Sequence, residues 1–400
     1  MSRILATSHP HIILVEPGLH SPDGHMRGEL EAMSSGLNSL GVECCIVGWK
    51  PPAQSFGATS ETTFVSPRFE GLINLLPPRL GVRLLEFQVY RKAFAEGQRT
   101  GKSVVIGLTA SGPFGPAIAA VCAKNIPPTI LVTRHTGGAL HSRRSPWRLA
   151  FEALAKRGVA FGAYSTAVEQ ILRAMLPRCG DLIRHLPEVI ADTPKDASEK
   201  PTHPRGVLLV SGTDSVGRRA PITHLIATKT IPFEKVILHD PSGRFVGCDD
   251  LQSKHGSAVL FERVSSYFTD DFPGFLQTGS AVLVAYDPAF INPSSILRHS
   301  LSAGVPSIST RFPDSDFLVG NFGHIGEMWD FGNVESMALA MRRFTNWQKK
   351  DFDMLQSSSH AIRAWANPVA SASALLDFAM EVRSSAGRLK GTSQRDLSGR

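Results

Sequence analysis

The sequence has no long apolar stretch and no paired cysteine motif. No run approaches the roughly 18 apolar residues that a membrane-spanning helix needs. The apolar residues 12–15 are followed at once by Glu16, which indicates a strand and not a secretory signal. The five cysteines are an odd number without Cys-x-x-Cys spacing, which favours neither a disulfide framework nor a zinc site. A reducing, cytoplasmic environment is therefore expected.

Other chemical signatures are missing as well. Phosphate-loop and dinucleotide-binding fingerprints are absent, and residues 243–247 do not follow a strand as such a glycine loop requires. No nucleic-acid-binding module is recognisable, so a nucleic-acid partner is not expected. The paired acids Asp249-Asp250 and Asp270-Asp271 fall in predicted loops, where solvation explains them. No metal cofactor is expected.

Charge is sparse and unevenly distributed along the 400 residues. Only 19% of the residues are charged, whereas 42% are hydrophobic, which is enough for the two cores that this length predicts. Residues 1–195 hold 21 Lys+Arg and 14 Asp+Glu, while residues 196–400 hold 21 of each. A basic half beside a neutral half indicates an anionic partner, such as membrane phospholipid, a lipid-phosphate acceptor or nucleic acid.

Strands and helices alternate along both halves. Residues 11–15 form a β-branched apolar run, residues 26–40 carry apolar side chains at steps of three or four, and residues 42–47 form a second run after Gly41. This pattern predicts a βαβ unit with a right-handed crossover and a parallel sheet. Strands are also predicted at residues 103–107, 129–133, 159–164, 206–211, 235–238, 281–285 and 307–310. The prediction is an α/β protein with two doubly wound sheets.

One segment carries a family resemblance. Residues 281–310 read as a strand, a polar loop, a helix, the sequence Ser302-Ala303-Gly304-Val305-Pro306, and a short strand of small residues. This order resembles the GT-B glycosyltransferases, specifically the retaining family 4. Gly304 suits the helix end, and Pro306 prevents the helix from continuing. An anion would be stabilised at the helix N-terminus by backbone amides and the helix dipole.

The resemblance implies a donor-binding region with altered chemistry. The family's paired glutamates, eight residues apart, fall at Phe290 and Arg298, and an arginine cannot accept a hydrogen bond but could hold a phosphate. Two further segments resemble the family less closely. One is the strand and turn that end at Gly212, followed by the basic residues Arg218 and Arg219; the other is the first loop, with Gly24 and His25. The predicted donor-binding residues are Gly212, Arg218, Arg219, Phe290, Asn292, Pro293, Ser294, Ser295 and Arg298.

Two histidines are weighed as site residues. His135 follows the strand at residues 129–133, where the family often has a histidine beside the donor sugar, so it is the candidate catalytic residue. Gly24 and His25 would form an acceptor-side loop. For each of them an ordinary loop role is an open alternative.

The resemblance also implies a domain organisation. A Rossmann-like acceptor-side domain would span residues 1–192, a proline-rich linker residues 193–205, and a Rossmann-like donor-side domain residues 206–355. The two domains would face each other across a cleft, as in the GT-B architecture. Helices at residues 356–382 could cross back to the first domain, and residues 383–400 would form a disordered tail.

The implied function is transfer of a sugar from a nucleotide-sugar to a polysaccharide or glycolipid acceptor, with retention of configuration and no cofactor. The substituted glutamates leave a non-catalytic binding or partner protein as an alternative, and a sugar-nucleotide epimerase as another. The basic, partly apolar stretch at residues 79–94 could touch an anionic membrane, which would place the protein at its inner face. A core-packing helix with a solvated basic edge is the alternative for that stretch.

Overall fold

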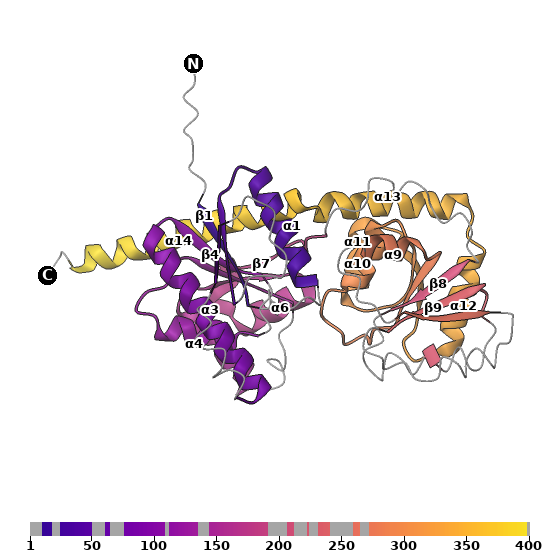
Figure 1. Ribbon diagram of the computed structural model, residues 1–400, viewed down its shortest axis with the longest axis horizontal. Coiled ribbons are helices and arrows are strands. Elements are labelled where there is room, and N and C mark those ends of the chain that lie inside the picture. The colour runs from indigo at the N-terminus through magenta and orange to yellow at the C-terminus, as the bar shows by residue number, and fades with distance from the viewer. Residues whose placement is uncertain are drawn as a thin grey trace, which may run out of the picture. The chain divides into compact units, whose positions relative to one another are not determined.

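The computed structural model divides the chain into two α/β units (Figure 1). The first contains Met1–Val189 and Pro368–Arg400, and the second contains Ile190–Asn367. The structure describes residues 10–17, 25–49, 61–64, 76–108, 112–134, 144–190, 206–211, 222–223, 231–240, 259–264 and 272–397. The predicted linker at residues 193–205 lies outside these residues.

The first unit contains a seven-stranded parallel sheet in the order β3-β2-β1-β4-β5-β6-β7. The strands are β1 (His11–Glu16), β2 (Cys44–Gly48), β3 (Glu61–Phe64), β4 (Ser103–Gly107), β5 (Thr129–Thr133), β6 (Ala160–Ala163) and β7 (Ile183–His185). The predicted strands at residues 103–107 and 129–133 are confirmed. The order reverses between β1 and β4, which is where open parallel sheets commonly bind ligands.

Helices cover both faces of this sheet. They are α1 (His25–Ser39), α3 (Pro78–Thr100), α4 (Phe114–Cys122), α5 (Pro146–Lys156), α6 (Thr166–Met175) and α14 (Pro368–Leu397), with a 3-10 turn at Pro177–Leu182. Figure 1 shows α3 and α4 on one side of the sheet and α1 and α14 on the other. Residues 12–16 of β1 are all buried, as expected of a strand whose two faces are both covered.

Helix α14 belongs to the first unit because it packs on α1. A β-carbon at Gly36 of α1 would lie 2.1 Å from the Pro368 carbonyl oxygen, so only glycine allows this close crossing. Leu375 and Ala379 are buried in the same core as Leu30. The tail from residue 383 was predicted to be disordered, but α14 continues to Leu397. Once a helix has formed, each further residue adds one backbone hydrogen bond, which favours its extension.

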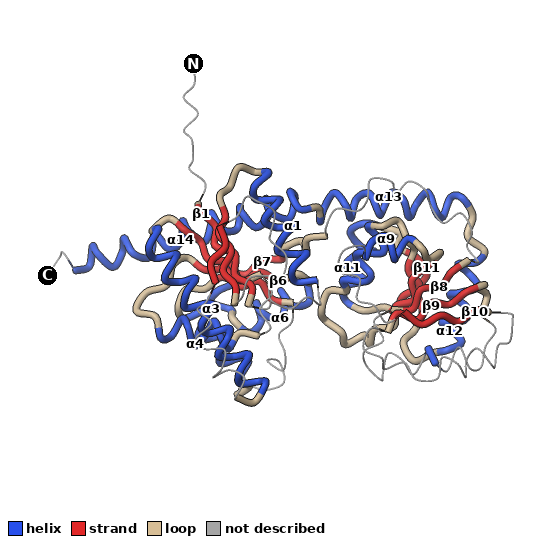
Figure 2. The backbone as a smooth tube through the Cα atoms, viewed as in Figure 1, coloured by secondary structure: helices blue, strands red, loops and turns tan. Residues whose placement is uncertain are grey.

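The second unit contains a six-stranded parallel sheet in the order β10-β9-β8-β11-β12-β13 (Figure 2). Its strands are β8 (Val207–Val210), β9 (Lys235–His239), β10 (Leu260–Val264), β11 (Ala281–Val284), β12 (Ser307–Thr310) and β13 (Gly326–Trp329). Its described helices are α9 (Phe272–Gln277), α10 (Ser295–Ser302), α11 (Pro313–Phe322), α12 (Val334–Thr345) and α13 (Lys349–Ala366). The order reverses between β8 and β11. The prediction of two doubly wound α/β sheets is confirmed.

Local sequence explains several element boundaries. Helix α13 ends at Ala366. Its C-cap Asn367 is extended (ψ 160°) because a proline follows it, and this confirms the predicted interruption. Gly304 takes a φ of +77° after α10 and lets the chain turn into β12. Among the described residues, no helix is both long enough and apolar enough to cross a membrane.

Candidate functional site

In the second unit, the candidate site is the carboxyl edge of the sheet, where the chain leaves β11 and enters α10. Thr310, the last residue of β12, clamps the start of this segment. Its hydroxyl accepts a hydrogen bond from the Tyr286 amide (3.0 Å) and donates one to the Tyr286 carbonyl (2.7 Å). The Asp287 carboxylate then accepts a hydrogen bond from the Ala289 amide at 2.8 Å, which forms a local turn. Two neighbouring strands therefore fix the path of the loop.

Ser294 caps the N-terminus of α10. Its hydroxyl accepts a hydrogen bond from the Leu297 amide at 3.2 Å, as Ser does at this position in many helices. Its own amide donates to Asp314 Oδ2 at 2.7 Å. The helix start is thus held from within and from the neighbouring helix α11. Positive helix-dipole charge at this end favours an anion.

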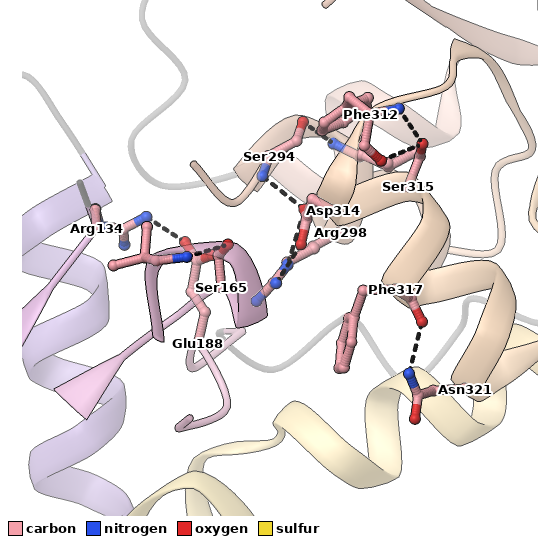
Figure 3. Close-up of polar contacts among 12 residues, drawn as sticks. Arg134, Ser165, Glu188, Ser294, Arg298, Phe312, Asp314, Ser315, Phe317 and Asn321 are labelled. Atoms are coloured by element: carbon pink, nitrogen blue, oxygen red, sulfur yellow. Dashed lines mark hydrogen bonds and ion pairs between the residues drawn. The ribbon is translucent and has the colours of Figure 1, made fainter. Parts of the chain in front are cut away.

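Arg298 and Asp314 form a buried ion pair behind this cap (Figure 3). Arg298 Nη2 donates to Asp314 Oδ1 at 2.5 Å and Nε donates to Oδ2 at 3.2 Å. Both side chains are 1% exposed. The guanidinium carbon of Arg298 also lies 5.5 Å from the Trp365 ring centroid. The prediction that Arg298 holds a phosphate is wrong, because its guanidinium is buried against Asp314 and does not reach the surface.

Asp314 therefore ties α11 to α10 at two points, the cap and the first turn. Figure 3 shows it between Ser294 and Arg298, with one carboxylate oxygen serving both the cap amide and the guanidinium. Arg298 neutralises a carboxylate that would otherwise place negative charge beside the α10 N-terminus. The ion pair thus leaves no net charge from these two side chains beside the α10 N-terminus.

Phe290 lies in an aromatic cluster and is half-buried. Its ring stacks on Tyr286 with centroids 4.3 Å apart and an interplanar angle of 13°, and it lies 6.0 Å from Phe312. Asn292 and Ser295 are half-buried in the same segment, and Pro293 is buried. A donor-binding role for these four residues stays a prediction.

The end of β8 lies beside the end of β9, and a side-chain pair joins them. Ser211 Oγ lies 3.0 Å from His239 Nδ1, and the His239 ring lies 5.2 Å from that of Phe275. The sequence reasoning missed His239, although it directly follows the predicted strand at residues 235–238. Gly212, Arg218 and Arg219 lie outside the described residues, so their donor-binding role stays a prediction.

In the first unit, the carboxyl edge of the sheet holds a buried charge cluster that the sequence reasoning also missed. Arg134 follows β5, and its two terminal nitrogens donate to Glu29 of α1 and to Glu188, each at 2.5 Å. Its guanidinium carbon lies 5.2 Å from the ring centroid of Tyr164, which follows β6. The side chains of both glutamates are under 5% exposed. Figure 3 shows the Arg134–Glu188 contact.

Arg134 also fixes the backbone next to a predicted site residue. It ties the end of β5 to α1 and to the segment after β7, and residue 135 comes immediately after it. His135 itself lies outside the described residues, as does Gly24. His25 is the first residue of α1, and its side chain is not described. The catalytic role of His135 and the acceptor-side role of Gly24 and His25 stay predictions.

Burial shifts the protonation of the cluster. Burial raises the pKa of Glu29, and Glu188 adds to this effect, whereas Arg134 and the Tyr164 hydroxyl oppose it. Burial disfavours the Arg134 cation, but Glu188 and Glu29 outweigh it and raise the pKa of Arg134. Two carboxylates thus share one guanidinium, and burial favours the protonated form of Glu29.

Glu29→Gln should make stability less dependent on pH. A carboxyl group whose pKa is raised by folding contributes stability below its unfolded pKa of 4.5, and this contribution is lost as the pH rises through the folded value. Glutamine does not titrate, so the free energy of unfolding of the variant should rise relative to that of the wild type as the pH rises. Urea unfolding at about pH 5 and about pH 8 measures this difference.

Glu31→Gln is the matched control on the same helix, because Glu31 is 41% exposed and pairs with Arg27 one turn away. We expect it to change the free energy of unfolding by less than about 0.5 kcal/mol. An equal effect of Glu29→Gln at both pH values would mean that Glu29 does not change protonation on folding.

Comparisons with known proteins agree with this fold. No family model and no curated protein matches the sequence. Among solved structures, a glycosyltransferase from Rickettsia africae is similar with a TM-score of 0.64, 13% identity, and coverage of 94% of this chain and 99% of that one. Anabaena HepE, in complex with UDP and glucose, gives a TM-score of 0.65, 14% identity, and coverage of 92% and 99%. Sucrose-phosphate synthase from Thermosynechococcus elongatus is similar with a TM-score of 0.63 and 13% identity, and the match covers 96% of this chain and 100% of that one. The protein therefore has the two-domain fold of GT-B glycosyltransferases.

Proposed function

We propose that the protein is a glycosyltransferase that moves a sugar from a nucleotide-sugar to a polysaccharide or glycolipid acceptor, with retention of configuration. The observation that supports the proposal most is the structural likeness, over nearly the full length of both chains, to glycosyltransferases that include a UDP-bound protein. The residue-level support is the α10 N-terminus, which lies at the carboxyl edge of a parallel sheet and is free of uncompensated negative charge.

The donor diphosphate would bind at this helix end. The α10 dipole would stabilise the negative charge that develops on the leaving diphosphate, and this electrostatic effect would supply much of the catalysis. Ser294 and Asp314 hold the helix start rigid, so no reorganisation energy is spent during the reaction. Arg218 and Arg219, at the start of the segment after β8, are the proposed side-chain partners of the phosphates.

The proposed site needs no resident cofactor, since a helix terminus and arginines meet the phosphate charge. Within the part of the chain that the structure describes, no three His, Cys, Asp or Glu residues are arranged to hold a metal ion. His135, which follows Arg134 at the carboxyl edge of the first sheet, is the proposed catalytic residue of the acceptor side. Gly24 and His25 would contact the glycan or lipid-linked acceptor.

A nucleotide-sugar should stabilise the protein against heat. At a ligand concentration of about 100 Kd, one member of a panel of nucleotide-sugars should raise the Tm by about 5–10 °C. The double variant Arg218→Gln/Arg219→Gln should lose most of this rise, because the phosphates lose both cationic partners. Differential scanning fluorimetry measures both effects.

Arg342→Gln is the matched control, since Arg342 is an exposed arginine in the last turn of α12. It should keep the full rise in Tm. If no nucleotide-sugar or nucleoside diphosphate shifts the Tm, or if the double variant responds like the wild type, the proposed donor site is wrong.

One observation favours a second candidate, a non-catalytic relative that binds a nucleotide-sugar, a glycan or a partner glycosyltransferase. The two positions where family 4 carries glutamates hold Phe290 and Arg298, and Arg298 is buried in its ion pair. These positions therefore present no carboxylate to a sugar or a ribose. Product analysis separates the candidates: binding without consumption of any nucleotide-sugar, in the presence of lipid-linked and glycan acceptors, would favour the non-catalytic relative.

A further inference from the structure

In the second unit, the segment that joins β11 to α10 carries an aromatic stack with one partly exposed ring. The Phe290 ring stacks on Tyr286, with centroids 4.3 Å apart and planes 13° apart, and lies 6.0 Å from Phe312. Tyr286 is 6% exposed and Phe312 is 1% exposed, so both belong to the core. Phe290 is half-buried. Because Tyr286 covers one face of its ring, the exposed part of Phe290 lies on the side away from Tyr286.

Hydrogen bonds hold the backbone of this stack in place. The Phe290 amide donates to the Asp287 carbonyl at 2.8 Å, and the Asp287 carboxylate closes the same turn through the Ala289 amide. Thr310 clamps the Tyr286 backbone from the neighbouring strand. An aromatic side chain also has only two rotatable χ angles, so the Phe290 ring loses little conformational entropy when a ligand packs on it.

The aromatic stack lies close to the α10 cap. Phe290 precedes Ser294 by four residues, which span at most about 14 Å. One short stretch of chain also approaches both: the Phe312 ring lies beside Phe290, and Asp314, two residues later, accepts a hydrogen bond from the Ser294 amide. A sugar attached to the donor diphosphate that we propose for this cap would therefore be within reach of the Phe290 ring.

Carboxylates are scarce in the sequence around this ring. Residues 272–313 contain a single acidic residue, Asp287, whose Oδ1 accepts a hydrogen bond within its own turn. Asp314 is buried in its ion pair, and Asp316 has an arginine partner at 3.9 Å. A carboxylate accepts hydrogen bonds from hydroxyl groups strongly, whereas an aromatic ring offers no comparable acceptor. A sugar hydroxyl that faced Phe290 would therefore lose its hydrogen bonds to water without replacement.

We propose that the donor is the nucleotide derivative of a deoxy sugar, and that the deoxy carbon of this sugar packs on Phe290. The inference rests on the proposed sugar transfer and names the class of its donor. A methyl or methylene group gains from contact with the ring, because apolar area leaves water and no hydrogen bond is broken. Phe290 is thus a specificity-determining residue. An apolar contact of this kind discriminates against one hydroxyl group by about tenfold to a hundredfold.

Isothermal titration calorimetry with the full chain tests the proposal. The ligands are UDP-glucose, dTDP-glucose and GDP-mannose, the 3-, 4- and 6-deoxy analogues of each, and the free nucleoside diphosphates. In at least one series, a deoxy analogue should bind at least about tenfold more tightly than its parent. If every deoxy analogue binds like its parent or more weakly, while the nucleotides bind, the inference is wrong and the proposed donor site stands. If no nucleotide binds, both fail.

Two substitutions of Phe290 assign the preference to this ring. Phe290→Gln should abolish the preference for the deoxy analogue, because an amide can form hydrogen bonds with a hydroxyl group. Phe290→Leu should keep the preference, because the side chain stays apolar. Both variants should keep the wild-type Kd for the free nucleoside diphosphate. A weaker Kd for that ligand would mean that Phe290 stacks on the base or holds the phosphate site together, which would overturn its assignment to the sugar.

Phe317→Gln is the matched control in the same unit. Phe317 is also a half-buried phenylalanine, but it lies on α11 and packs against Phe322 and Trp365. This variant should keep the preference for the deoxy analogue. An equal loss of the preference in Phe317→Gln and Phe290→Gln would show that general loosening of the unit, and not contact with the Phe290 ring, sets the selectivity.

Discussion

Asp314→Ala should lower the free energy of unfolding of the second unit by about 3–5 kcal/mol, the usual cost of removing one partner from a buried ion pair. The variant leaves the Arg298 cation 1% exposed without its carboxylate, and it leaves the Ser294 amide without its acceptor. Urea unfolding followed by tryptophan fluorescence measures this loss, because Trp329, Trp347 and Trp365 lie in that unit.

Asp316→Ala is the matched control for this change. Asp316 lies two residues away on α11 and is 61% exposed, and its carboxylate is 3.9 Å from the Arg311 guanidinium. Its removal should cost less than about 1 kcal/mol. The double variant Arg298→Met/Asp314→Leu should be more stable than Asp314→Ala, because no unpaired charge stays buried. If Asp314→Ala were no more damaging than Asp316→Ala, the pair would not hold the α10 cap as described.

The Arg298 interpretation failed for a reason that applies to single sequences in general. The sequence shows an arginine in the first turn of a helix that follows a strand, which is where a phosphate contact is plausible. Its partner is Asp314, 16 residues later and on another helix. The signal was present in part, because Pro313 and two aspartates just after a strand are typical of a helix start. The helix α11 was not predicted, so the partner was not found.

Most of the fold could be predicted because its rules are local. Buried parallel strands read as continuous apolar runs, as in β4 and β5, and the helix periodicity between them shows which connections cross over. The turn at Gly304 follows from a residue that tolerates a φ of +77°, followed by Pro306. Short polar strands such as β3 (Glu-Thr-Thr-Phe) carry no such pattern, because their place is set by the neighbouring strand and not by their own side chains.

The charge cluster of the first unit could not be predicted in this way. Arg134 is 105 residues from Glu29 and 54 from Glu188, and the three follow or lie on unrelated elements. Glu29 lies between the apolar positions of α1, where a charge in a sequence reads as an exposed residue. Only the sheet order, which brings the ends of β5 and β7 to one edge, shows that the three side chains meet.

Arg134→Met should destabilise the first unit by about 3–5 kcal/mol at neutral pH, because it leaves two carboxylates buried without their shared cation. The cost should shrink as the pH falls. Arg134 opposes the effect of burial on Glu29, so without it the pKa of Glu29 rises further and protonation relieves the strain at acid pH. Urea unfolding at about pH 5 and about pH 8 therefore distinguishes this loss of charge balance from a loss of packing, which would be the same at both.

The double variant Arg134→Met/Glu29→Gln completes the test, because it leaves a single buried carboxylate instead of two that repel each other. Its free energy of unfolding should exceed that of Arg134→Met at about pH 8, and the two should be nearly equal at about pH 5. Arg99→Met, which removes a 72% exposed arginine paired with Glu96 on α3, should cost less than about 1 kcal/mol at either pH. A pH-independent loss in Arg134→Met that Glu29→Gln does not relieve would show that Arg134 stabilises the edge of the sheet by packing on Tyr164 and not by balancing two carboxylates.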